Sequence, residues 1–283
     1  MRKELLLIIL AVTPLVAFGN VVAPDLGAAL PFGLLGGTIS NTGTSLVTGD
    51  VGAVTTITGF PPGTATGTVY PAPSDPTVSA AYSDFLTAFS LAYSDISTPT
   101  TQLVTDLTTD RTFRGDNVFY FLLTDVVSTA NINLSFDAQN DSNAVFIIKI
   151  ARDLTINGPL TFDLQRGARA DHIYWVVGRS ATISSGGGAV DFDGNILAGS
   201  TFTMSANPGG SGVLAGTIDG CVFAQNANTL AGRTNVGGCV NAGSAVPEPD
   251  SATLVACACF LGLALRHAKR RKQFATSGRT SAI

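Results

Sequence analysis

Apolar and polar residues alternate along this chain with two different periods, and residues 75–96 follow the helical one. Asp75 is a favourable helix N-cap, Pro76 suits the first helical position, and Pro99 ends the pattern. The stretch has no basic residue, which argues against a helix lying on a membrane surface. We therefore predict one amphipathic helix packed along a sheet. Its apolar side chains recur in steps of four and three, at Val78, Tyr82, Phe85, Phe89, Ala92 and Ile96.

Most of the remaining sequence between residues 24 and 240 has the two-residue period of β-strands. Residues 131–136 alternate polar and apolar side chains, and such stretches are separated by Gly, Asn and Asp, which are common turn residues. These patterns predict one mainly β domain over residues 24–240, with a single long helix.

Four segments in the second half of the chain align as a loose repeat. Each has an apolar strand, a short polar turn, and a Thr followed by an apolar residue. These Thr residues are separated by 27, 21 and 26 positions, and irregular periods of this size are typical of a solenoid with unequal loops. The segments are residues 146–156, 173–183, 194–204 and 220–230.

The repeat also predicts which side chains face outward. If the apolar residue after each Thr points into the core, the Thr points out, because side chains alternate along a strand. Two positions earlier, also outward, lie Asp153, Ser180, Thr201 and Ala227. The candidate binding residues on this stacked face are Thr155, Ser180, Thr182, Thr201, Thr203 and Thr229.

Two explanations of this Thr column stay open. Thr suits β-strands and pairs well across them, so the column can be purely structural. Alternatively, hydroxyl and methyl groups held on a flat, rigid lattice order a sheet of water that can join an ice crystal. Bulky or charged side chains would disturb such a surface, and the chain has only four Lys and no Glu between Glu4 and Glu248.

Composition excludes several classes of protein. Charged residues make up 13% of the chain, against about 25% in an ordinary soluble domain, which argues against a disordered chain or a coiled coil. Residues 20–250 hold eight Lys and Arg against nineteen Asp and Glu, a net charge of −11, whereas the whole chain has −4. Nucleic acid and anionic lipid are therefore not expected partners of the domain.

The N-terminus has the features of a secretory signal peptide over residues 1–23. Arg2 and Lys3 precede an apolar run, and small residues follow it, with cleavage expected between Gly19 and Asp25. A membrane anchor is the alternative, but the apolar run is short for a bilayer core of about 30 Å.

The C-terminus contains a Pro-Glu-Pro motif at Pro247, Glu248 and Pro249 within a linker over residues 241–251. A hydrophobic segment with a basic cluster follows over residues 252–272, and then a tail over residues 273–283. This arrangement resembles the PEP-CTERM sorting signal of Gram-negative bacteria. The resemblance implies transient membrane association, processing by exosortase-type machinery, and a secreted or cell-surface location. The tail is longer than usual in such signals, so a plain tail anchor is the alternative.

The cysteines and titratable residues give little evidence for catalysis or a cofactor. Cys221 and Cys239 fall in the exported domain, where a disulfide can form, but the sequence does not decide whether they meet. Cys257 and Cys259 lie in the apolar tail segment and have no His or further Cys beside them, so no metal site is expected. His172 has no companions at a useful spacing and is expected to be structural.

Paired carboxylates are the remaining sign of an enzyme, because some solenoids hydrolyse or cleave polysaccharides with them. Asp191 and Asp193 share one side of a predicted strand. However, Asp193 and Asp219 each precede a Gly, which is the place of a turn-forming Asp. We therefore expect no catalytic residues, no cofactor and no enzymatic activity.

Eight short motifs occur in order along the domain, at residues 32–37, 40–43, 48–52, 58–63, 137–139, 143–147, 175–178 and 194–198. Together they resemble the bacterial and fungal ice-binding (antifreeze) protein family. The resemblance implies a right-handed, discontinuous β-solenoid of triangular section with one long helix alongside. It also implies adsorption to ice through one flat face, with thermal hysteresis and inhibition of recrystallisation.

The sequence departs from that pattern at three places. Residues 111–114 contain two Arg where a Gly-rich turn is expected, Arg152 and Asp153 bring charge near the proposed face, and residues 207–210 lengthen one coil. A second function stays open, that of an adhesin or biofilm-matrix protein with the same fold, which has exopolysaccharide as a possible partner and does not bind ice.

Overall fold

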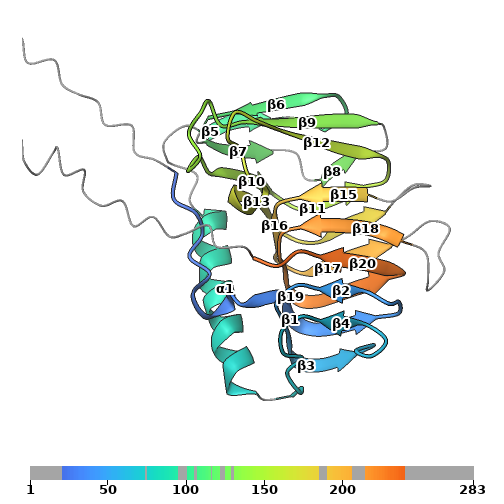
Figure 1. The fold of residues 1–283 in the computed structure, drawn as a ribbon. Coiled ribbons are helices and arrows are strands. Elements are labelled where there is room, and N and C mark those ends of the chain that lie inside the picture. Colours follow the sequence, from blue (N-terminus) through green and yellow to red (C-terminus); the bar gives the residue numbers. More distant parts are fainter. Residues whose placement is uncertain are drawn as a thin grey trace, which may run out of the picture. The chain divides into compact units, whose positions relative to one another are not determined.

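Parallel strands wound into stacked coils form the domain (Figure 1). The computed structural model describes residues 21–73, 75–94, 101–104, 107–115, 117–121, 125–128, 131–184, 190–205 and 214–239. All of them belong to one compact unit, Met1–Ala242, and the second unit, Gly243–Ile283, lies outside the described residues, as does the predicted signal peptide up to residue 20. Among the described residues, no helix is long and apolar enough to cross a membrane.

Each coil contributes strands to three faces of the solenoid. The first face, which we call the helix face, is covered by the long helix. Its strands are β5 (Thr101–Val104), β7 (Asn117–Phe121), β10 (Phe146–Ile150), β13 (Ile173–Val177) and β16 (Asn195–Ala198).

The second face, which we call the hydroxyl face, has no element packed on it among the described residues. Four of its strands are β8 (Asp125–Ser128), β11 (Asp153–Ile156), β14 (Ala181–Ser184) and β17 (Thr201–Ser205). Three longer strands cross from the helix face to the hydroxyl face, so that their first halves belong to one and their second halves to the other. These are β19 (Val222–Ala231), β1 (Phe32–Asn41) and β3 (Asp50–Thr58).

The third face, which we call the acidic face, consists of two sheets. The three-stranded sheet contains β12 (Leu160–Gln165), β9 (Ile132–Asp137) and β6 (Arg111–Arg114). The five-stranded sheet contains β15 (Val190–Asp193), β18 (Leu214–Asp219), β20 (Arg233–Val236), β2 (Leu46–Val47) and β4 (Thr64–Ala65).

The solenoid is discontinuous in sequence, because the first two coils stack on the last one. β1 pairs in parallel with β19, with Leu34 opposite Val222, and β3 pairs with the other edge of β1. In Figure 1 the N-terminal strands β1 to β4 therefore follow β19 and β20 at one end of the stack. Together with the helix beside it, this arrangement confirms the predicted mainly β solenoid fold.

The helix α1 (Pro76–Ser94) begins where the sequence predicts. The Asp75 carboxylate accepts a hydrogen bond from the Thr77 amide at 2.8 Å, and its carbonyl accepts one from the Ser79 amide at 3.0 Å. The first bond satisfies an amide that the first helical turn leaves free, and the second is the first bond of the helix itself. Pro76 occupies the first helical position, as predicted, and Ile96 lies outside the described residues.

One side of α1 is buried on the helix face. Phe85 is fully buried and meets Phe223 of β19 edge to face, with ring centroids 5.5 Å apart. The helix is also fixed at the border of the hydroxyl face, because the Tyr82 hydroxyl donates to the Gln225 carbonyl at 2.6 Å and the Tyr93 hydroxyl donates to the Ala151 carbonyl at 2.9 Å. The helix thereby covers one face and leaves the next one bare.

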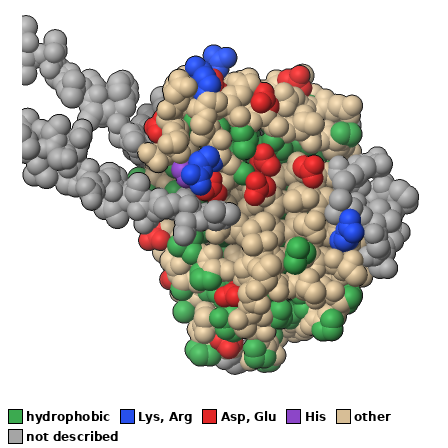
Figure 2. Space-filling model, viewed as in Figure 1, with side chains coloured by type: hydrophobic (Ala, Val, Ile, Leu, Met, Phe, Trp, Pro, Cys, Tyr) green, Lys and Arg blue, Asp and Glu red, His purple; other side chains and the backbone are tan. Residues whose placement is uncertain are grey.

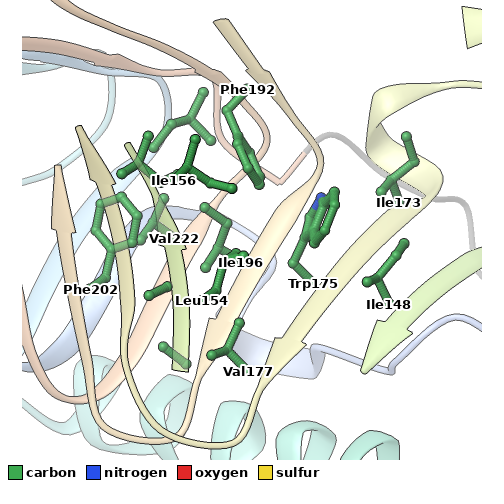
Figure 3. Close-up of a cluster of buried hydrophobic side chains, with 14 of the residues drawn as sticks. Ile148, Leu154, Ile156, Ile173, Trp175, Val177, Phe192, Ile196, Phe202 and Val222 are labelled. Carbon is green, nitrogen blue, oxygen red and sulfur yellow. The ribbon is translucent and has the colours of Figure 1, made fainter. Parts of the chain in front are cut away.

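Inward-pointing side chains fill the solenoid with a continuous apolar core (Figure 3). Trp175 is fully buried against Phe136 and Phe192, and its indole N–H donates to the Asp193 carbonyl at 3.0 Å. Residues 111–114 form strand β6 instead of the expected turn, because Phe113 is buried in this core, 4.7 Å from the Phe119 ring.

A disulfide and two short helices complete the described part of the domain. Cys221 and Cys239 form a disulfide, with Cα atoms 4.6 Å apart, which settles the pairing that the sequence left open. Short 3₁₀ helices lie at Gly27–Ala29 and Ala170–His172. His172 is buried, with Nδ1 3.3 Å from the Ala144 carbonyl oxygen, as expected for a structural residue.

Candidate functional site

A rank of Thr side chains runs across the middle of the hydroxyl face, perpendicular to the strands. Thr155 lies opposite Thr182, Thr182 opposite Thr203, and Thr203 opposite Thr229. This is the register of the aligned repeat, so the structure brings these four predicted residues onto one face. We call this line of side chains the central rank.

The central rank continues into the N-terminal coils, which the sequence analysis did not include. Ser40 of β1 lies opposite Thr229, and Thr58 of β3 lies opposite Ser40. The signal in the sequence was the alternation of Thr38, Ile39 and Ser40, which is the same polar and apolar pattern as in the repeat. The sequence could not show which strand lies beside β1, because its partner β19 is almost 190 residues away.

A second rank lies two residues earlier on each strand. Thr201 is opposite Ala227, and Ala227 is opposite Thr38. The Thr201 hydroxyl donates to the Ser180 hydroxyl at 3.0 Å, so the two remaining predicted residues also lie on this face. Thr56 of β3 extends the rank beyond Thr38. We call this line the border rank, since it follows the edge shared with the helix face.

Most hydroxyls of the central rank are free to bind water, whereas the Thr58 hydroxyl donates to the Ile39 carbonyl oxygen at 3.4 Å. In the part of the chain that the structure describes, the side chains of Thr155, Thr182, Thr203 and Thr229 have no hydrogen-bond partner. All four are half-buried by their neighbours. Each hydroxyl therefore presents one donor and two acceptor sites to solvent while its position on the face is restricted.

The apolar residues beneath the hydroxyl face make it rigid. Ile156, Ile183, Met204 and Leu230, which follow the four Thr residues, are all buried in the core. Parallel pairing sets the spacing of the Thr side chains at about 4.7–4.9 Å across strands, and the two ranks are about 6.6 Å apart along each strand. The result is a fixed two-dimensional array of small side chains.

Charged residues occur at one end of the border rank. Asp153 takes the border position on β11, where its carboxylate accepts a hydrogen bond from the Ser180 amide at 2.9 Å. It also pairs with Arg179 at 3.7 Å, and Arg152 pairs with Asp125 at 3.8 Å. The charge expected from Arg152 and Asp153 is therefore present at the edge of the face. Residues 207–210 lie outside the described residues.

The acidic face has the same coil geometry but different chemistry. Asp193 lies opposite Asp219, and Asp191 lies opposite Thr217. Burial, followed by repulsion from Asp219 and Asp191, raises the pKa of Asp193 to about 6. Figure 2 shows acidic side chains on this face near β12 and β15.

The acidic residues fit a structural role better than a catalytic one. Asp193 precedes Gly194, which has a φ of +114° and turns the chain from the acidic face to the helix face. The Gly194 amide donates to the Asp219 carbonyl at 3.0 Å, so the equivalent turns of two coils are bonded to each other. Within the described ranges, no group of three or more His, Cys, Asp or Glu residues is placed to hold a metal ion.

Comparison with known proteins finds similar sequences and structures. A family model described as ice-binding-like matches residues 34–236. An ice-binding protein of Nostoc sp. (strain HG1) is 32% identical over 244 residues, which cover 81% of each chain. The crystal structure of an ice-binding protein from the Antarctic ascomycete Antarctomyces psychrotrophicus is 31% identical, with a TM-score of 0.64 over 77% of this chain and 99% of that one.

A more distant structure shows the same fold. The structure of an ice-binding protein from an Arctic yeast, described by its antifreeze activity, has a TM-score of 0.60 at 22% identity, over 76% of this chain and 93% of that one. The discontinuous stacking and the single helix alongside thus belong to a fold shared by proteins of low sequence identity.

Proposed function

This chain belongs to the ice-binding-like family, and from that premise we propose that it adsorbs to ice through the hydroxyl face. The observation that carries the proposal is the central rank, in which Thr155, Thr182, Thr203 and Thr229 stand in register with free hydroxyls. The helix occupies another face, and the third carries Asp163, Asp191, Asp193 and Asp219 among its outward side chains. The hydroxyl face is thus the flat surface available to a crystal.

The geometry supports adsorption for two physical reasons. The Thr array is already fixed by the sheet and the core, so binding costs little conformational entropy. Its methyl groups favour removal from liquid water, while its hydroxyls hydrogen-bond to the ordered layer. Ice between adsorbed molecules must then grow with a curved front, which lowers its freezing temperature and slows recrystallisation.

Family membership also supports the expectation that the protein is not an enzyme. Ice adsorption through this face needs no cofactor, because the proposed contact consists of hydroxyl and methyl groups held on a rigid sheet. Asp191 and Asp193 then need no catalytic role.

Export of the domain is part of the proposal. It is supported by the signal-peptide pattern of residues 1–23 and by the resemblance of residues 247–272 to a PEP-CTERM signal. On this model, exosortase-type machinery processes the C-terminus after transient membrane association, and the protein works in the medium or at the cell surface. The Cys221–Cys239 disulfide suits an oxidising compartment.

The second candidate function is that of a surface adhesin or matrix component that uses the same solenoid without binding ice. The sorting-signal resemblance favours it, since surface retention and exopolysaccharide contact would serve both roles. The two functions differ in one observable property, which is the effect of the pure protein on growing ice.

The test is nanolitre osmometry and a recrystallisation assay on the purified protein. We expect shaped crystals, a hysteresis gap and suppressed coarsening. Thr182→Tyr should reduce the gap several-fold, because the ring projects outward from the line of Thr side chains. Thr217→Tyr is the matched control, since Thr217 occupies an outward strand position on the acidic face.

Both variants should keep the circular dichroism spectrum of the wild type. Crystals that grow unshaped and coarsen as in buffer would leave the adhesin function in place of ice binding. Activity that survives Thr182→Tyr but not Thr217→Tyr would move the ice contact to the acidic face.

A further inference from the structure

The hydroxyl face is divided along the solenoid axis by charge. On β8, β11 and the turn before β14, the border carries the ion pairs Arg152–Asp125 and Arg179–Asp153. The four side chains are between 27% and 55% exposed, so all of them keep contact with solvent. We call this part of the face the charged end.

The other part of the face carries no charge. β17, β19 and β1, and β3 after Asp50, contain no Lys, Arg, Asp or Glu. At the positions corresponding to Arg152 and Arg179, the next coils have Ser200 and Asn226, and the Asn226 amide donates to the Ser200 hydroxyl at 3.1 Å. We call this part the neutral end.

From this division we infer that the ice contact is centred on the neutral end and stops at the charged end. The inference rests on the proposed function and specifies which part of the face acts. The contact would include the N-terminal coils and exclude Thr155, although Thr155 stands in the central rank. Its residues are Thr38, Ser40, Thr56, Thr58, Thr201, Thr203 and Thr229, with Thr182 of β14 at its edge.

The physical reason lies in how charges are solvated. An exposed ion pair orients the surrounding water around each charge, and removing that water is far more costly than dehydrating a hydroxyl. An ice lattice cannot reorient its molecules to replace the lost hydration. Ice that approaches the charged end therefore meets a layer of strongly held liquid-like water, whereas at the neutral end it meets hydroxyls and methyl groups.

Backbone register supports the same boundary. The position next to Thr155 in the central rank belongs to Val127 of β8, so the series of hydroxyl residues ends with β11. In the opposite direction the series continues through Ser40 to Thr58 at the last coil. The centre of the uncharged array is therefore near β19 and β1, where the first coil stacks on the last one.

Tyr substitution along the central rank tests the inference. Ser40→Tyr and Thr203→Tyr should each reduce thermal hysteresis several-fold, while Thr155→Tyr should retain most of the wild-type hysteresis. All three positions are half-buried on neighbouring or nearby strands of one sheet, so they serve as controls for one another. Circular dichroism and the urea midpoint of each variant would confirm that folding is retained.

A second variant removes the ion pair beside Thr155 and leaves Arg152–Asp125 in place. The double substitution Asp153→Asn with Arg179→Gln keeps an oxygen that can accept the Ser180 amide. We expect it to increase hysteresis, and Thr155→Tyr in that background should now be strongly deleterious.

The outcomes separate the inference from the function it rests on. Wild-type protein without hysteresis would overturn both. Active wild type in which Thr155→Tyr costs as much as Ser40→Tyr would overturn only the division of the face, and so would a double variant with unchanged activity.

Discussion

The hydroxyl face and the acidic face are built from the same coils but present different side chains to solvent. Both are parallel sheets above one apolar core, with Met204 buried beneath the first and Ile218 beneath the second. The hydroxyl face then presents Thr residues in register. The acidic face presents Asp191, Asp193 and Asp219, together with Arg233 near its other end.

The comparison shows that inward and outward positions have separate roles in this fold. Inward residues determine that a coil forms and where it stacks, and they are apolar on both faces. Outward residues contribute less to folding and are free to specialise. A face becomes a candidate ice surface because its outward residues are small, uncharged and aligned, and the solenoid geometry alone does not make it one.

The strongest test of whether outward residues decide which face binds ice is to exchange one type of outward residue between the two faces. Thr203→Asp places a charge in the centre of the central rank and should remove most of the thermal hysteresis, because the carboxylate holds its own hydration. Asp191→Thr on the acidic face should leave hysteresis unchanged. Similar activities for the two variants, measured by osmometry at equal concentration, would mean that outward chemistry does not distinguish the faces.

Inward positions should behave alike on both faces. Met204→Ala and Ile218→Ala each remove a fully buried side chain and should lower the free energy of unfolding by about 2–5 kcal/mol. Denaturant unfolding measures both. Hysteresis per folded molecule should change little in either variant. A loss of hysteresis in Met204→Ala alone would show that the core side chains beneath the hydroxyl face keep it flat enough to bind ice.

The smallest expected effect is a pH dependence that belongs to the acidic face. The pKa of Asp193 is raised to about 6, above its ordinary value near 4, so the folded state holds this proton more tightly than the unfolded state. Its contribution to stability is therefore greatest at low pH and is lost as the pH rises from about 4 to 6.

Asp193→Asn removes this titration and should raise stability at pH 7, while leaving hysteresis unchanged. Urea unfolding of the wild type and the variant at several pH values measures the difference. A variant less stable than the wild type at pH 7 would show that the carboxylate is stabilised there, contrary to its environment of burial and two nearby carboxylates.

Local pattern was sufficient for several elements. The steps of four and three fixed the helix, and Asp75 and Pro76 marked its start, because caps and amphipathic spacing act within a few residues. The repeat gave the register from Thr155 to Thr229, since each coil carries the same alternation. All six predicted outward residues consequently lie on one face, and their role in ice binding stays a prediction.

Other features of the fold could not be predicted, because they depend on contacts between residues that are distant in the sequence. The β6 strand has Arg at both ends, and only the burial of Phe113 against Phe119 explains why it joins the sheet. The Cys221–Cys239 bridge likewise required the last coil to turn back beside its own start.

The sequence by itself determined which side chain of each strand points outward, because that choice follows from a two-residue period within the strand. Only the tertiary structure decided which strands are neighbours. Thr38-Ile39-Ser40 has the same alternation as every other coil, and nothing in it specifies a partner almost 190 residues away. Stacking of β1 on β19 joins the first and last coils into one array, and it places residues of the N-terminal coils at the centre of the proposed ice contact.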